Sequence, residues 1–204
     1  MGQDRNSGQG QAGEHPQSKI ATPARVFVGL KIAPDIATQL AEFATALNQP
    51  SVRRVASADI HLTLVPPWNE AFIPEAIKKL RRVAVRCEAF WLSLRRISYG
   101  PQPRRPRLLW VDCGTGEAII TLRTALLEVY GQTDERPFQP HVTLARIRSD
   151  GPLIARKYPM DRLSLAQHVD SVELFQSPPP GETGYRTLAS CRLRKSSDAL
   201  QIGS

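Results

Sequence analysis

The chain has 204 residues, a formal net charge of +8 at pH 7 and a hydrophobic content of 41%. Such a length supports one hydrophobic core or two small lobes packed together. No apolar run approaches the roughly 18 residues of a transmembrane helix, and the polar amino terminus has no signal-peptide core, so we expect a cytoplasmic protein without a membrane partner. The basic charge favours a polyanionic partner, with nucleic acid first. The three cysteines lie far apart without metal-ligand spacing, so no zinc site is expected. We also expect no other metal and no cofactor.

Strand-like and helix-like segments alternate between two polar tails. Residues 1–23 are rich in Gly, Gln and Ser and are predicted to be disordered, and residues 195–204 are expected to fray. The folded domain is therefore expected to span residues 24–194. In chain order we predict a strand at 25–33, a helix at 34–49, two short strands within 52–67, a helix at 73–89, strands at 90–100 and 107–113, a helix at 117–132, a strand at 141–147, and a closing strand pair within 163–177 and 184–193.

Two of the predicted strands carry the same motif, "HLTL" at 61–64 and "HVTL" at 141–144. Side chains alternate along a strand, so His61 and Thr63 share one face, and so do His141 and Thr143. The intervening aliphatic residues can then be buried on the opposite face. Each motif follows a helix, which suggests an internal duplication: two α+β lobes, each presenting one motif strand to a common cleft.

This constellation suits acid–base chemistry at a phosphoryl group. Histidine titrates near neutral pH, so two imidazoles on either side of a phosphate can serve as general base and general acid. Threonine hydroxyls can donate hydrogen bonds to the non-bridging oxygens. His168 has no partner motif and is interpreted as a structural residue.

The paired motifs resemble the signature of the two-histidine (2H) phosphoesterase superfamily, and within it the RNA 2′,3′-cyclic phosphodiesterase or 2′-5′ RNA ligase family. The resemblance extends over roughly residues 24–194 and includes "RPRLLWVD" and "RPFQPHVTLAR". It implies an α+β, bilobal, pseudo-twofold fold in which two antiparallel sheets flank a central cleft, with helices on the outside. One segment departs from the family pattern: "VPPWNE" at 65–70 stands where a Phe-Leu-Gly-type sequence is usual.

The resemblance also implies the reaction. Similar enzymes hydrolyse a 2′,3′-cyclic phosphate at an RNA end to a 2′-phosphate, without metal. By analogy His141 would activate water, His61 would protonate the departing 3′ oxygen, and Thr63 and Thr143 would hold the phosphate. Running the reaction backwards would give 2′-5′ RNA ligation.

Several residues near the motifs are candidate substrate contacts. Arg146 is expected on the catalytic face of a regular strand, and the family often has an arginine there. One of Arg53 and Arg54 could also face the cleft, and "PRRPR" at 103–107 is either a basic rim for RNA or a solvated loop. Three aromatic residues in or beside the loops near the motif strands are candidates for base stacking or, equally, loop anchors: Trp68, Phe138 and Tyr185. Trp91 and Trp110 lie within strands and are predicted to be core residues.

Three functions stay open on these observations. The first is a monomeric enzyme acting on RNA ends with a 2′,3′-cyclic phosphate, in single-stranded or tRNA-like RNA. The second is a phosphodiesterase acting on a small cyclic phosphate, such as a nucleotide or an ADP-ribose derivative. The third is an RNA-binding module without turnover, which would have no need of two proton-transferring histidines.

Overall fold

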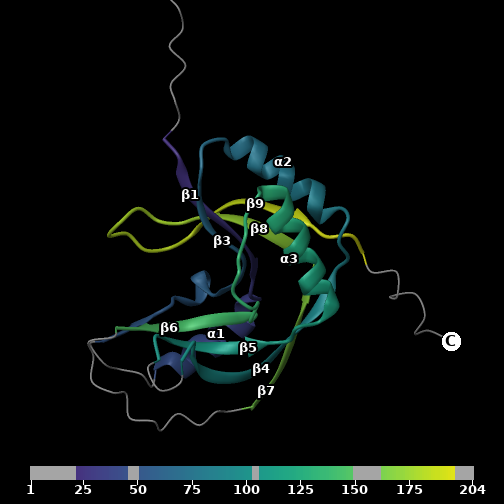
Figure 1. Ribbon diagram of the computed structural model, residues 1–204. Helices are drawn as coiled ribbons and strands as arrows, with labels where there is room; N and C mark the ends of the chain where they lie inside the picture. Colours follow the sequence, from purple (N-terminus) through teal and green to yellow (C-terminus); the bar gives the residue numbers. More distant parts are fainter. Residues whose placement is uncertain (1–21, 46–50, 103–105, 149–161, 196–204) are drawn as a thin grey trace, which may run out of the picture.

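The computed structural model describes residues 22–45, 51–102, 106–148 and 162–195 (Figure 1). The predicted tails at 1–23 and 195–204 lie almost entirely outside these residues, as does most of the "PRRPR" loop. The elements are β1 (Ala24–Lys31), α1 (Pro34–Thr45), β2 (Val52–Arg54), the 3₁₀ turn η1 (Ser57–Asp59), β3 (His61–Glu70), α2 (Ile73–Ala84), β4 (Phe90–Gly100), β5 (Leu108–Cys113), α3 (Glu117–Tyr130), β6 (His141–Ile147), β7 (Arg162–Val169), β8 (Ser171–Gln176) and β9 (Arg186–Arg192).

The described strands form one curled antiparallel sheet in the order β7-β4-β5-β6-β3-β1-β8-β9, with β2 pairing along β6. The two motif strands meet at its centre, where the strand pairing between β3 and β6 consists of Leu62 opposite Val142. We call β3, β1, β8 and β9 the β3 half, and β7, β4, β5, β6 and β2 the β6 half. The predicted α+β fold is therefore confirmed, and the two expected sheets are joined into one through the motif strands.

The two halves share a strand–helix–strand arrangement, β1-α1-β3 with β2 and η1 inserted before β3, and β5-α3-β6, and in each the two outer strands pair antiparallel. In both units the helix packs on the opposite half. Helix α1 lies against β2 and β6, whereas α3 lies beside α2 and against β3 (Figure 1). Each half therefore combines segments from distant parts of the chain, and the two halves are interlocked.

A glutamine on β7 ties the start of α1 to the β6 half. The Gln167 side chain donates a hydrogen bond to the Lys31 carbonyl at 2.9 Å and accepts one from the Ala33 backbone N–H at 3.0 Å. Both groups belong to the turn between β1 and α1, and the Gln167 side chain is buried. Since buried backbone groups must be paired, this contact fixes where α1 crosses between the halves.

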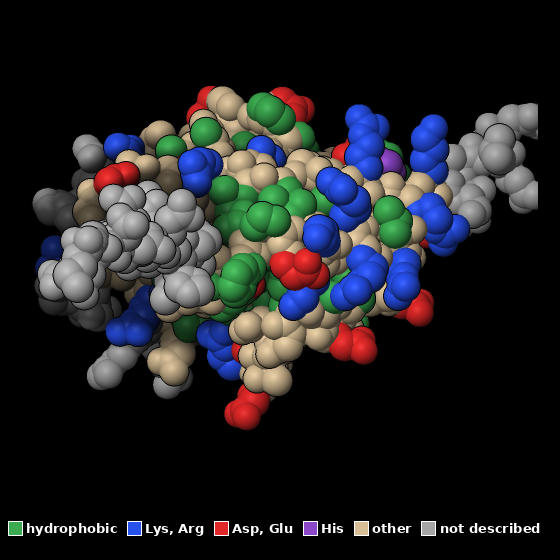
Figure 2. Space-filling view, turned by 90° about the horizontal axis from the view of Figure 1, so that it is seen from above, with side chains coloured by type: hydrophobic (Ala, Val, Ile, Leu, Met, Phe, Trp, Pro, Cys, Tyr) green, Lys and Arg blue, Asp and Glu red, His purple; other side chains and the backbone are tan. Residues whose placement is uncertain are grey.

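The core lies between the helices and the helix-facing side of the sheet. Leu62, Leu64, Val142 and Leu144 are all at most 1% exposed, as the motif alternation predicts. The opposite side of the motif strands is therefore free to carry the polar residues. The outer surface of α2 carries Lys and Arg side chains, and Figure 2 shows such side chains gathered over the helical face.

The structure corrects three predicted elements. The strand expected within 163–177 is two strands, β7 and β8, at distant positions in the sheet. Val169 and Val172 are both buried although three residues apart, which one regular strand cannot do on a single face. Helix α2 ends at Ala84 instead of residue 89, because the following backbone hydrogen-bonds to Arg194. Trp91 is not a core residue: it is 71% exposed and contacts the His168 ring.

No helix among the described residues has the length and apolar character needed to cross a membrane.

Candidate active site

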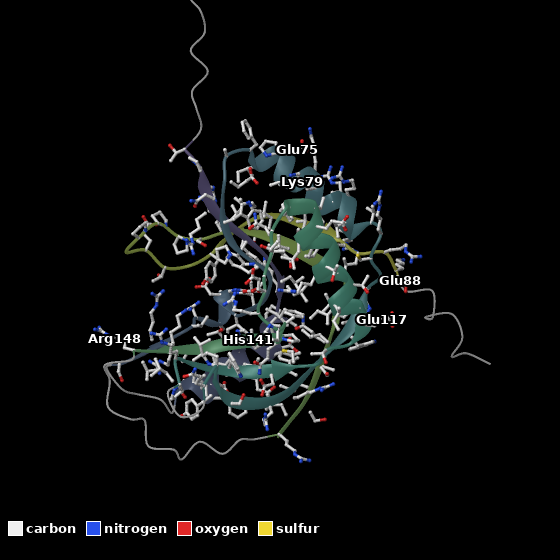
Figure 3. All side chains as sticks on the ribbon, in the orientation of Figure 1. Glu75, Lys79, Glu88, Glu117, His141 and Arg148 are labelled. Atoms are coloured by element: carbon white, nitrogen blue, oxygen red, sulfur yellow. The ribbon has the colours of Figure 1, made fainter. Side chains whose placement is uncertain are left out.

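The motif residues come together in one hollow between the two halves of the sheet. It measures about 140 Å³. Its walls are formed by Val55, His61, Thr63, Leu108, His141, Thr143, Arg146 and Tyr185. Both histidines and both threonines proposed from the motifs therefore line the same hollow, and Figure 3 shows His141 where β6 faces the other half of the sheet.

The two imidazoles are held in matching ways. Nδ1 of His61 lies 2.7 Å from the Asp59 carbonyl oxygen, and Nδ1 of His141 lies 2.8 Å from the Gln139 carbonyl oxygen. A carbonyl oxygen can only accept, so Nδ1 carries the hydrogen in both rings. In the neutral form this leaves Nε2 of each ring with a lone pair for proton transfer. In both motifs the acceptor lies two residues before the histidine, which is a property of the local chain.

Aromatic rings pack against His61 from the β3 half. The ring centroids of Phe27 and Tyr185 lie 4.9 and 5.0 Å from that of His61, and Phe175 lies 5.7 Å away. The Tyr185 backbone N–H donates to the Asp59 carboxylate at 3.0 Å. Asp59 thus orients the imidazole through its carbonyl and the Tyr185 segment through its side chain.

Trp110 packs against His141 from β5, with 4.3 Å between ring centroids. Its indole N–H donates to Ser98 Oγ at 2.8 Å, and Ser98 donates to the Asp112 carboxylate at 2.7 Å. Trp110 is buried as predicted, but it also supports the second motif, which the sequence did not indicate. It lies there because β5 pairs Trp110 with Thr143.

Burial is the main influence on both imidazoles. It lowers the pKa of His61 below 6.5, and the positive charges of Arg146 and His141 lower this pKa further. The hydrogen bond to the Asp59 carbonyl and the negative charge of Asp59 act in the opposite direction and raise it. Burial and Arg146 also lower the pKa of His141, while the bond to Gln139 and the charge of Asp112 raise it. Both rings therefore stay neutral to lower pH than a free imidazole does.

Arg146 reaches the hollow for a different reason from the one expected. It lies three residues beyond Thr143, so a regular strand would turn it to the opposite face. Instead the pairing with β5 shifts register, and Leu144 and Ala145 are both buried, which returns Arg146 to the side that lines the hollow.

The first motif has the same irregularity. The β1–β3 pairing shifts register next to Val65, and Leu64 and Val65 are both buried. Five residues after His61 stands Pro66, whereas five residues after His141 stands Arg146. Each motif therefore contributes one histidine and one threonine to the hollow, whereas the arginine comes from the second motif strand.

A larger groove of about 410 Å³ adjoins the hollow and shares Thr63, Leu108 and His141 with it. Phe138 lines this groove, and the Arg123 guanidinium lies 4.4 Å above its ring centroid. Arg123 is itself held by Asp134 at 3.0 Å. Phe138 thus lies next to the motif residues, as expected for a base-stacking residue.

Trp68 lies elsewhere, so the structure does not bring this stacking candidate to the site. Its ring packs against Tyr130 at 4.8 Å between centroids, and its N–H donates to Glu70. Strand β3 pairs Trp68 with Val26, a core residue, which turns the indole toward the helices.

Among the described residues, no three His, Cys, Asp or Glu side chains converge in the arrangement of a metal site.

Comparisons with known proteins agree with this fold and identify the family. The sequence model of the 2′-5′ RNA ligase superfamily matches residues 32–177. The RNA 2′,3′-cyclic phosphodiesterase of Aeropyrum pernix is 28% identical over 152 residues, which cover 71% of this chain and 77% of that protein. The protein of the same name from Bacillus subtilis is 25% identical over 159 residues, which cover 74% and 86%. The crystal structure of TT0787 of Thermus thermophilus has the same fold, with a TM-score of 0.71 at 24% identity over 84% of this chain and 98% of that one. Because the superfamily model matches most of the chain, the protein belongs to the 2′-5′ RNA ligase superfamily, as its paired motifs predict.

Proposed function

We propose that the protein hydrolyses 2′,3′-cyclic phosphates at RNA ends to 2′-phosphates, without a metal ion. The observation that carries this proposal is that two histidines, two threonines and one arginine line the same hollow. Nδ1 of each histidine is hydrogen-bonded to a backbone carbonyl oxygen. The names of the relatives from Aeropyrum pernix and Bacillus subtilis support the same substrate class.

In the proposed reaction, Nε2 of His141 takes a proton from a water molecule whose oxygen attacks phosphorus. The bond between phosphorus and the 3′ oxygen breaks, and Nε2 of His61 gives that oxygen a proton. The two histidines exchange protonation states and are reset by solvent. The assignment of base to His141 and acid to His61 follows the family resemblance. An anionic phosphate in the hollow favours the imidazolium form that the acid requires.

The other side chains of the hollow would stabilise the negative charge. The hydroxyls of Thr63 and Thr143 would donate to the non-bridging oxygens as charge builds up on them. The Arg146 guanidinium would pair with the same phosphate, because arginine donates to phosphate oxygens with a fork of N–H groups. With a 5′-hydroxyl of a second RNA as the nucleophile in place of water, the same groups would join the two RNAs through a 2′-5′ phosphodiester, and the bond between phosphorus and the 3′ oxygen would again break.

The groove lined by Phe138 is the proposed site of the terminal base. It adjoins the hollow at Thr63 and His141, so a nucleoside whose phosphate sits in the hollow can place its base there. Stacking on an aromatic ring stabilises a base without requiring a particular sequence. Tyr185 would instead wall the hollow, since its ring stands edge-on to His61. A single chain supplies every group in this mechanism, which supports the expectation of a monomer.

The test uses a short RNA ending in a 2′,3′-cyclic phosphate, with EDTA present, and follows the phosphate by phosphorus NMR. The wild type should produce a 2′-phosphate. His61→Ala and His141→Ala should each lose roughly a hundredfold to ten-thousandfold in rate. His168→Ala is the matched control and should keep wild-type activity, because His168 is exposed on β7 and lies against Trp91.

An RNA end left intact by the wild type would contradict the proposal. If that protein opened only small cyclic phosphates, the second function considered from the sequence would replace it, and RNA binding without any turnover would point to the third. A 3′-phosphate product would mean that the bond to the 2′ oxygen breaks, which contradicts the proposed leaving group.

A further inference from the structure

Two arginines lie directly opposite each other on strands that border the catalytic hollow. Arg53 on β2 pairs with Arg146 on β6, and Arg146 pairs on its other side with Leu108 of β5. Residues directly opposite in an antiparallel pair point to the same face, with Cβ atoms about 4.5–5.5 Å apart. Leu108 and Arg146 both line the hollow, so Arg53 stands on the catalytic face, one strand farther out.

This arrangement is unfavourable for the protein alone. Like charges directly opposite each other on a sheet are destabilising. Both arginines are exposed, and within the described parts of the chain neither guanidinium has a carboxylate partner. The charge pair becomes favourable when an anion lies over both strands.

The neighbouring arginine provides an internal comparison. Arg54 is also exposed, but β2 pairs it with Ala145, whose side chain is buried on the opposite face from Arg146. Arg53 and Arg54 therefore carry the same charge at adjacent positions and face opposite sides of the sheet.

The paired strands β2 and β6 also extend from the hollow toward the edge of the molecule. Strand β6 runs from His141 to the edge of the molecule, where Figure 3 shows Arg148. The Arg148 backbone N–H donates to the Ser51 carbonyl at 2.9 Å, so β2 borders β6 up to this edge. An RNA strand whose end is bound at Arg146 can leave along this border.

We propose that Arg53 binds the phosphodiester that precedes the terminal cyclic phosphate, and that the enzyme therefore prefers oligonucleotides to mononucleotides. This inference rests on the proposed function. Arg146 engages the reacting phosphate and Arg53 the preceding one, on adjacent strands that lie about 4.8 Å apart. The planar guanidinium fork matches the two free oxygens of a phosphodiester.

The experiment compares two substrates, 2′,3′-cyclic AMP and a tetraribonucleotide that ends in the same cyclic nucleotide. The kcat/KM of each is measured for the wild type, Arg53→Gln and Arg54→Gln. We expect the wild type to favour the tetranucleotide, and Arg53→Gln to lower the tetranucleotide-to-mononucleotide ratio about tenfold, the size of effect that about 1.4 kcal/mol produces. Arg54→Gln should leave the ratio unchanged.

Two further measurements separate phosphate binding from a structural role. One phosphate contact to a single strand contributes about 0.7 to the slope of log kcat/KM against log salt concentration, so Arg53→Gln should reduce the slope for the tetranucleotide by about that amount. The Tm of Arg53→Gln should equal or exceed that of the wild type, because the variant removes a like-charge pair.

The outcomes for the inference and for the proposed function differ. A wild type that turns over both substrates, with a ratio that Arg53→Gln does not change, overturns the inference and leaves the proposed function intact. An equal fall for both substrates in Arg53→Gln, or an equal effect of Arg54→Gln, also overturns it. A wild type inactive on both substrates overturns the proposed function, and the inference with it.

Discussion

Gly29 lets β1 approach the first motif strand closely, and replacing it with alanine should disturb both stability and catalysis. Gly29 pairs with Thr63 on one side and Glu173 on the other. A Cβ atom at Gly29 would lie 2.5 Å from the Leu62 carbonyl oxygen and 3.5 Å from a ring carbon of Phe175. Real Cβ contacts below 3.0 Å essentially do not occur, so the Leu62 backbone must move away by at least about half an ångström.

The cost to stability follows from this clash. Overpacking typically destabilises by about 1–3 kcal/mol. Gly29 does not have a positive φ, so alanine regains roughly 0.5–1 kcal/mol of backbone entropy. The net loss is about 1–2 kcal/mol, which lowers Tm by roughly 2–8 °C for a chain of this size.

The cost to catalysis arises because the displaced atom belongs to Leu62. This residue lies between His61 and Thr63, and its pairing with Val142 joins the two halves of the sheet. A misplacement of about 1 Å can cost a hundredfold in rate, so we expect Gly29→Ala to lower kcat/KM by roughly tenfold for a 2′,3′-cyclic nucleotide.

The assay combines thermal unfolding with initial rates measured well below the Tm of the variant. Gly116→Ala makes the same chemical change where nothing lies within 4 Å of the added Cβ, and it should keep the wild-type kcat/KM. If Gly29→Ala shows wild-type Tm and kcat/KM, the close approach of β1 does not position His61.

Three other predictions concern the site itself. Because burial and the Arg146 charge lower the pKa of both His61 and His141, kcat/KM should be greatest below pH 6.5 and fall as the pH rises above it. Arg146→Gln should move the whole pH profile of kcat/KM to higher pH. An unchanged profile would mean that Arg146 does not lower these pKa values. Trp110→Phe should lower kcat by about three- to tenfold with little change in KM, since the smaller ring without an N–H holds His141 less firmly; an effect on KM alone would instead indicate substrate binding by Trp110. Phe138→Leu should raise the KM for 2′,3′-cyclic AMP about tenfold through lost stacking and leave the KM for a baseless ribose cyclic phosphate unchanged; an equal rise for both would place the base elsewhere.

The sequence predicted the parts of this protein that depend on local chain geometry. Strand alternation alone placed His61 with Thr63 and His141 with Thr143, opposite the buried leucines and valines. The helix boundary at Gly131 was also predictable, because its φ of 62° is a conformation that glycine adopts readily. The residues of the two motifs and of the segments beside them indicated the superfamily, which the match over residues 32–177 confirms.

The contacts between neighbouring strands of the sheet could not be predicted from the sequence. Register shifts bring Arg146 into the hollow, and the pairing of β3 with β1 turns Trp68 toward the helices. The pairing of β5 with β6 likewise places Trp110 behind His141.

The faces of the motif residues could be predicted and the contacts between strands could not, because the two depend on different parts of the chain. Whether a side chain lies on one face of a strand depends on its immediate neighbours, so the motif residues could be assigned from sequence alone. The residue opposite it depends on strand order and register, which are decided by the packing of segments far apart in the chain. The motif residues therefore lie in two short stretches of sequence, whereas the hollow that they line together, and the position of Arg53 beside it, exist only in the folded sheet.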